Sequence, residues 1–113
     1  MRLEEIDWPL QQGVEDLRRT YGNETSAHAF PSLYIWKTDM KLSLFCGREL
    51  FAVQFGLRGA NSWFFPCGAA PAVRSFIEER LQEGAQPCCL YYAQAEEAAL
   101  LEEWFPGRFH IQR

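Results

Sequence analysis

The residues with the clearest chemical potential lie in the segment CGAAPAVR, between a predicted strand and a predicted amphipathic helix. Such a turn can bind an anion, because free backbone N–H groups and the helix dipole point outward at a helix N-terminus. The candidates for this ligand loop are Cys67, Gly68, Ala69, Ala70 and Arg74. The same residues also fit a purely structural corner, in which glycine allows a tight bend and the alanines let helix and sheet approach closely.

Cys67 is also a candidate nucleophile, because the pKa of a thiol falls at a helix N-terminus. Its sequence neighbours include no histidine or carboxylate that could act as its base. His110 would be a base only if a terminal strand turned it toward Cys67, and a lone strand histidine is more often structural or exposed. Four carboxylates are expected to form a solvated helix face: Glu96, Glu97, Glu102 and Glu103. We therefore predict no catalytic residue in this chain.

Metal binding is not expected from the cysteine and histidine spacing. The cysteines contain no CxxC pair: Cys46, Cys67, Cys88 and Cys89. The two histidines lie far from them in the sequence, so a zinc site is not predicted. Adjacent cysteines in a strand point to opposite faces and cannot easily pair. We expect reduced cysteines that act as small buried hydrophobic residues.

Aromatic residues make up 15% of the chain, more than a small core is expected to hide. Strand residues with apolar neighbours on both faces need cover on both sides, so part of this surface is predicted to contact another chain. The candidates for an aromatic pocket or interface are Phe30, Tyr34, Trp36, Trp63 and Phe65.

The chain has 113 residues, which is the size of one domain, and its 48% hydrophobic content is enough for a core. Its net charge of -4 argues against binding to nucleic acid or to an anionic membrane surface. No apolar run is long enough to span a membrane, and the acidic N-terminal residues do not resemble a secretion signal. A cytoplasmic location is therefore expected.

Apolar spacing predicts four helices: 7–22, a short or broken one within 23–39, one from Pro71 to Gly84, and one from Gln94 to about Phe105. Alternating or continuous apolar runs predict five strands: 41–46, 49–57, 62–67, 87–93 and 108–112. The run 87–93 is apolar on both faces and is typical of a strand inside a sheet. The order of elements predicts a single α/β (α+β) domain, with a three-strand antiparallel meander in a mixed sheet covered by helices.

This order resembles the acetyltransferase-like superfamily, and three motifs narrow the resemblance. FPSLYIWK at 30–37, WFFPCG at 63–68 and LLEEWFPGRFHI at 100–111 are similar to the first half of the phosphatidylglycerol lysyltransferase C-terminal-domain family. The similarity covers residues 24–112, in the right order. Members consist of two tandem acetyltransferase-like halves, and some transfer an aminoacyl group from aminoacyl-tRNA to a lipid head group or a similar acceptor.

The resemblance implies that this chain is a non-catalytic half-domain that forms one wall of a substrate cleft or associates with a partner. The partner would be a second acetyltransferase-like half or a second copy of the chain. No cofactor is expected under this hypothesis. In one alternative, a minimal acyltransferase binds acyl-coenzyme A at Cys67–Arg74. In the other, the chain is a small-molecule sensor with an aromatic pocket around Tyr34, Trp36 and Trp63.

Overall fold

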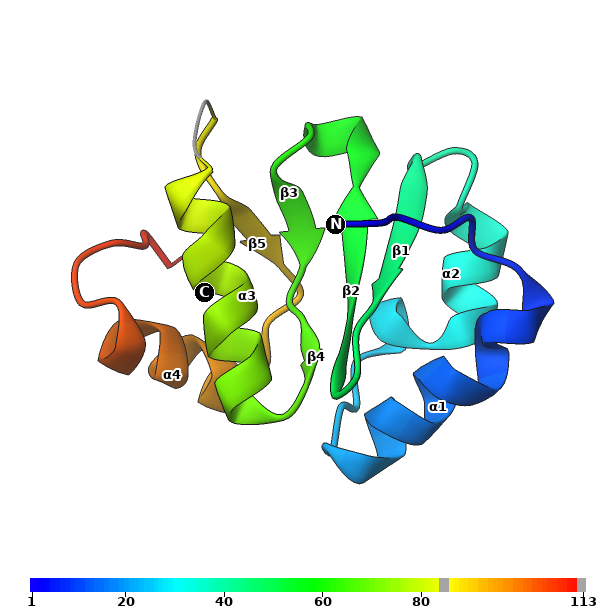
Figure 1. Cartoon of the computed structure of the whole chain (residues 1–113), viewed down its shortest axis with the longest axis horizontal. Helices are drawn as coiled ribbons and strands as arrows, with labels where there is room; N and C mark the ends of the chain where they lie inside the picture. Colours follow the sequence, from blue (N-terminus) through cyan, green and yellow to red (C-terminus); the bar gives the residue numbers. More distant parts are fainter. Residues whose placement is uncertain (84–85, 112–113) are drawn as a thin grey trace.

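The computed structural model describes residues 1–83 and 86–111 (Figure 1). Its four helices are α1 (Gln11–Thr20), α2 (Phe30–Trp36), α3 (Ala70–Gln82) and α4 (Ala95–Trp104). Short 3-10 turns are formed by Trp8–Leu10, Ser26–His28 and Gly56–Arg58. The strands are β1 (Leu42–Cys46), β2 (Leu50–Phe55), β3 (Ser62–Phe64), β4 (Cys67–Gly68) and β5 (Cys89–Tyr91).

The strands form one mixed sheet in the order β1-β2-β3-β5, and β4 pairs with β2. The β1, β2 and β3 pairings are antiparallel, whereas β3 and β5 run parallel. The predicted α+β class and the three-strand meander are therefore confirmed. The third predicted strand is split into β3 and β4, because Pro66 has no N–H to give to a sheet ladder.

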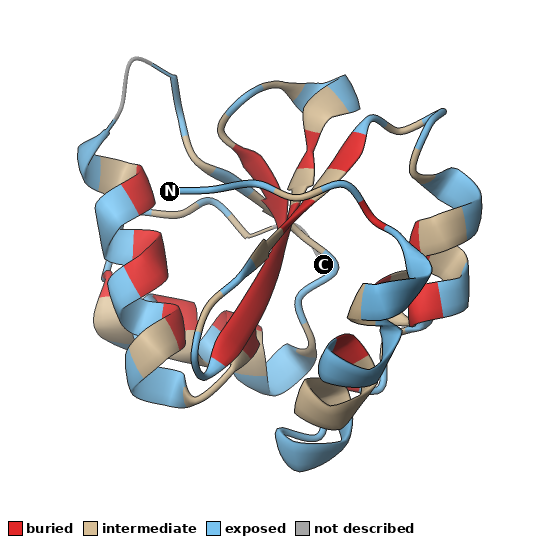
Figure 2. Ribbon diagram, turned by 45° about the vertical axis from the view of Figure 1, so that its right-hand side comes forward, coloured by how far each residue is buried: buried red, intermediate tan, exposed pale blue. Residues whose placement is uncertain are grey.

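Helices cover both faces of the sheet, α1 and α2 on one and α3 and α4 on the other (Figure 1). The middle strand β2 supplies Phe51, Val53 and Phe55 to the core under α1 and α2. It supplies Leu50 and Ala52 to the second core, under α3 and α4. Figure 2 shows buried residues along the central strands and on the inner sides of the helices.

Local signals mark the helix ends as expected. Asp7 accepts a hydrogen bond from the backbone N–H of Trp8, and Gly22 follows α1 with a φ of 69°. Pro31 lies in the first turn of α2, so the predicted second helix is broken in two, as expected. Gly107 has a φ of 73° and turns the chain after α4. Gly84, predicted to end α3, lies outside the described residues.

Three strand predictions need correction. The second strand ends at Phe55 rather than at Leu57, because Gly56 begins a 3-10 turn and leaves Leu57 exposed. The run 108–112 was expected to form a strand, but 108–111 are irregular and Gln112 is outside the described residues. Without that neighbour β5 is an edge strand, although its apolar pattern predicts a central one.

A membrane-crossing helix was not expected. In the part of the chain that the structure describes, none of the helices combines the length and the apolar character that crossing a bilayer requires.

Candidate functional site

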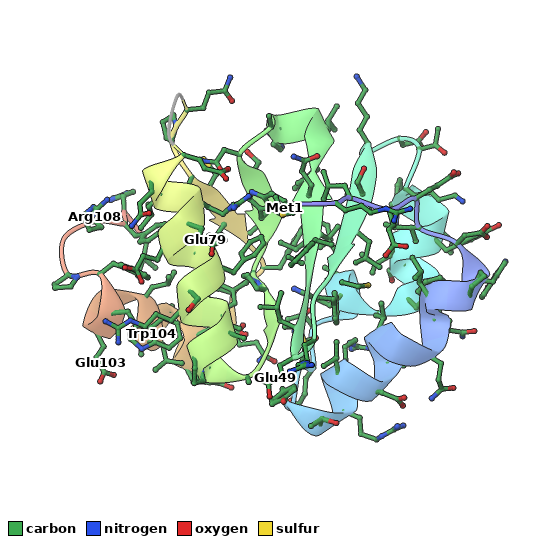
Figure 3. The ribbon with its side chains drawn as sticks, viewed as in Figure 1. Met1, Glu49, Glu79, Glu103, Trp104 and Arg108 are labelled. Carbon is green, nitrogen blue, oxygen red and sulfur yellow. The ribbon has the colours of Figure 1, made fainter. Side chains whose placement is uncertain are left out.

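The corner between β4 and α3 is packed against β2. A Cβ atom on Gly68 would lie 2.1 Å from the carbonyl oxygen of Glu49, so only glycine fits there. The N–H of Ala69 donates to that same oxygen at 2.9 Å, and Figure 3 shows Glu49 beside this corner. Pro71 in the first helical turn has no N–H. These contacts favour the structural interpretation of the corner over a phosphate loop.

Cys67 and Arg74, the side chains that could attack or bind a ligand at the corner, are poorly placed to act on the same ligand. Cys67 is buried, and burial together with the carboxylate of Glu97 raises its pKa to about 12. The side chain is therefore a thiol near neutral pH, and a thiol is a weak nucleophile. Arg74 lies in α3 and is exposed, whereas Cys67 lies in the core under α1 and α2.

His28 is a buried polar residue that the sequence analysis did not assign. It is 1% exposed, and its Nε2 donates to the carbonyl oxygen of Phe65 at 2.8 Å. With Nε2 as the donor, Nδ1 accepts a hydrogen bond from the hydroxyl of Thr25. Burial lowers the pKa of His28 to about 4, so the ring is neutral near pH 7. It supports the chain where β3 and β4 separate, but no local motif identifies it.

The N-terminus of α4 is held against the loop between α1 and α2, at Glu24. The side-chain oxygen of Gln94 accepts a hydrogen bond from the N–H of Glu24 at 2.9 Å. Glu97 in turn accepts one from the N–H of Gln94 at 2.7 Å. Burial is the main cause that raises the pKa of Glu97 to about 7. Nearby, the Asn23 side-chain nitrogen is buried and has no hydrogen-bond partner among the described residues.

The prediction of a solvated glutamate face therefore holds for three residues and is wrong for one. The exposed ones are Glu96, Glu102 and Glu103. Glu97 is only partly exposed, because the N-terminal turn of α4 packs against the loop that contains Glu24.

The five aromatic candidates do not form one pocket. Phe30 is buried in the core under α1 and α2, and Tyr34 packs beside it. Trp63 and Phe65 are buried on the opposite face of the sheet, under α3 and α4. Only Trp36 is well exposed, at 48%. The buried strand aromatics are thus covered within this chain, and the contact of other aromatic surface with another chain stays a prediction.

Trp36 lines a hollow of about 260 Å³, which we call the Trp36 hollow. Its other walls are Ser26, Ala27, Ser32, Met40, Leu42, Phe64 and Tyr92. The predicted pocket around Tyr34, Trp36 and Trp63 is therefore replaced by one that keeps only Trp36. The change arises because Tyr34 stacks on Trp8 with ring centres 4.6 Å apart, while Trp63 points to the other core.

A larger hollow of about 880 Å³ lies between β5, α4 and the segment after α4. We call it the edge groove. It is lined by residues 87–95, by Ala98 and Leu101 of α4, and by residues 108–111. Site prediction missed the groove because both 87–93 and 108–112 were taken as strands of one sheet. Its only sequence signal is the run of apolar residues on both faces of 87–93.

The free edge of β5 lies along this groove. The N–H of Cys89 donates to Asn61 at 3.0 Å, and the carbonyl oxygen of Tyr91 accepts from Phe65 at 2.8 Å. Residues 89 and 91 thus direct their backbone polar groups toward β3. Because these groups alternate along a strand, the N–H and C=O of Leu90 point to the open side.

Tyr92 separates the edge groove from the Trp36 hollow and lines both. Its φ of 61° is in the left-handed region, which costs a non-glycine residue about 1–2 kcal/mol. Its ring packs edge-on against Phe64 at 4.9 Å between ring centres, yet the residue is 45% exposed. A strained and exposed tyrosine between two hollows is a candidate ligand contact.

No metal centre was predicted, and within residues 1–83 and 86–111 no group of three or more His, Cys, Asp or Glu side chains is placed to hold one. All four cysteines are free thiols. Cys67 is buried as expected, whereas Cys46 and Cys89 are exposed, because they lie at the end of β1 and on the edge strand.

Comparisons with known proteins found no matching family model, no matching curated protein and no matching solved structure.

Proposed function

We propose that this chain is a non-catalytic α+β binding module that associates with a partner through the edge groove. The observation that carries the proposal is β5, a strand with apolar residues on both faces that lies at the sheet edge beside a hollow of about 880 Å³. The role agrees with the half-domain expected from the resemblance to two-domain aminoacyl transferases. In that setting the groove would contact a second half or another polypeptide.

The chemistry of the other candidates supports a non-catalytic role. Cys67 is a buried thiol, and both ring nitrogens of His28 already have partners. The amide of Ala69, at the start of α3, is bonded to Glu49. A minimal acyltransferase would need several free amides at this corner, whereas Pro71 has none and that of Ala69 is already bonded.

A small-molecule sensor is the second candidate, and the Trp36 hollow favours it. Trp36, Phe64 and Tyr92 offer aromatic surface to a ligand. The hollow of about 260 Å³ is slightly below the range of about 300–1,000 Å³ that is usual for small-molecule sites. Only a small, flat apolar ligand would fit.

A thermal-shift titration with acetyl-coenzyme A and free coenzyme A tests the proposal against the enzyme alternative. A ligand selective for the folded state must raise its melting temperature by mass action. We expect no saturable rise for the wild type. A saturable rise that Arg74→Ala removes would overturn the proposal, because Arg74 is the cation of the predicted ligand loop. Light scattering in the same buffer shows whether the chain self-associates.

A further inference from the structure

The two edges of the sheet differ in whether another segment of the described chain pairs with them. Along β1 the N-terminal segment forms a bridge, in which the N–H of Glu4 donates to Leu44 at 2.7 Å and the N–H of Leu44 donates back at 2.8 Å. Along β5, the described residues offer no such pairing partner, and Leu90 presents its backbone groups to the edge groove. Proteins usually protect an exposed edge with charged residues, proline or a bulge. Cys89, Leu90 and Tyr91 include none of these, and the shortness of β5, with three residues, is its one protection among the described residues.

The edge groove is lined by several segments, and this limits what it can hold. β5 lines one part of it, and residues 108–111 and two residues of α4 line other parts. A single extended segment needs only about 4.8 Å beside β5, the spacing of neighbouring strands, whereas a second copy paired through its own β5 would bring a whole domain to this edge.

The edge groove differs in charge from the chain as a whole, which has a net charge of -4. Arg108 and His110 line it, and no aspartate or glutamate does so among its described residues. Arg108 forms no ion pair with any carboxylate of residues 1–83 and 86–111. Figure 3 shows it on the loop that follows α4. Leu90, Phe109 and Ile111 are partly exposed and give the edge groove its apolar surface.

From these observations we propose that the edge groove binds an extended polypeptide segment as an added strand beside β5, with a carboxylate of that segment paired with Arg108. The inference rests on the proposed function and specifies its partner. Backbone hydrogen bonds to Leu90 supply affinity, and the alternating side chains of the segment supply specificity. One set of side chains faces Leu90, Phe109 and Ile111 and is therefore apolar.

A displayed library of random decapeptides tests this inference on the full chain. We expect enriched peptides that alternate apolar residues and contain an aspartate or glutamate. Their synthetic forms should bind Arg108→Glu several-fold more weakly, because loss of a surface ion pair worth up to about 1 kcal/mol weakens binding up to about fivefold and the reversed charge adds repulsion. Arg74→Glu is the matched control, an exposed arginine on α3 away from the groove, and should bind like the wild type.

Backbone pairing is tested on the peptide, so that the protein stays intact. Methylation of alternate peptide nitrogens should abolish binding in one register, and hydrogen exchange of the Leu90 amide should slow in the complex. Failure to enrich any peptide overturns the inference, as does binding that is unaffected by both methylation registers. Enriched peptides that contact only the Trp36 hollow also overturn it but leave the binding-module proposal standing. A saturable coenzyme A shift instead refutes the proposed function, whatever the peptides do.

Discussion

Replacing Glu97 with glutamine should stabilise the protein above neutral pH and leave its stability nearly unchanged in acid. Burial raises the pKa of Glu97 from its ordinary value of 4.5 to about 7. Below pH 4.5 the carboxyl is protonated in both folded and unfolded chains. As the pH rises through about 7, the folded chain must ionise a partly buried group, and the stability from that raised pKa is lost.

The size of this effect follows from the displaced pKa. A rise of the pKa from 4.5 to about 7 corresponds to about 3.4 kcal/mol of unfolding free energy, at about 1.36 kcal/mol for each unit of pKa. Because Glu97 is partly accessible to water, screening reduces the effect, and we expect about 1–2 kcal/mol. Glutamine keeps an oxygen that can accept the hydrogen bond from the N–H of Gln94. Only the charge is lost.

Urea denaturation followed by tryptophan fluorescence, at pH values from 4.5 to 8.5, measures the difference in unfolding free energy. The gap between Glu97→Gln and the wild type should open as the pH rises. Glu103→Gln, an exposed change on the same helix, should show no such trend. A gap of constant size, or a variant less stable than the wild type at pH 8.5, would refute the reasoning.

The other predictions concern buried groups and glycines. The wild type should lose unfolding free energy as the pH falls from 6.5 toward 4, because the unfolded chain protonates His28 while the folded chain keeps the ring neutral. In the same urea series, His28→Gln should show a smaller loss over this pH range. Gly68→Ala should lower the melting temperature strongly or prevent folding. Gly13→Ala should raise the melting temperature slightly, because a Cβ atom there meets nothing within 4 Å. Equal effects of the two changes would contradict the packing argument. Iodoacetamide at pH 8 should label Cys89 before Cys67 in native protein, as read by mass spectrometry, and simultaneous labelling would contradict the burial of Cys67.

Local signals predict most of the fold, because they act over a few residues. Asp7 and Gly22 bound the first helical segment, and Pro31 breaks the second, as expected from their backbone chemistry. The position of β5 could not be predicted in this way. The apolar pattern of β5 predicts that both of its faces are covered, but it does not say which segments cover them. That depends on where residues 108–111 pack.

The candidate site was harder to predict than the fold, because its contacts join distant segments. The corner at Gly68 was identified, and its tight fit against Glu49 supports the structural interpretation. His28 reaches Phe65 across 37 positions, and Gln94 reaches Glu24 across 70. A lone histidine or glutamine carries no periodic signal, so neither pairing can be inferred from one sequence.

The path of the chain after β5 explains why the edge groove is open. Tyr92 adopts a left-handed conformation directly after the strand, which turns the chain away from the line of the sheet. Gln94 then fixes the start of α4 to the loop at Glu24. With both ends of this turn fixed, α4 packs against a face of the sheet through Leu101 rather than covering the edge. The left-handed turn at Tyr92 and the bond at Gln94 thus direct α4 away from the open edge of β5, where we propose that a partner strand pairs with Leu90.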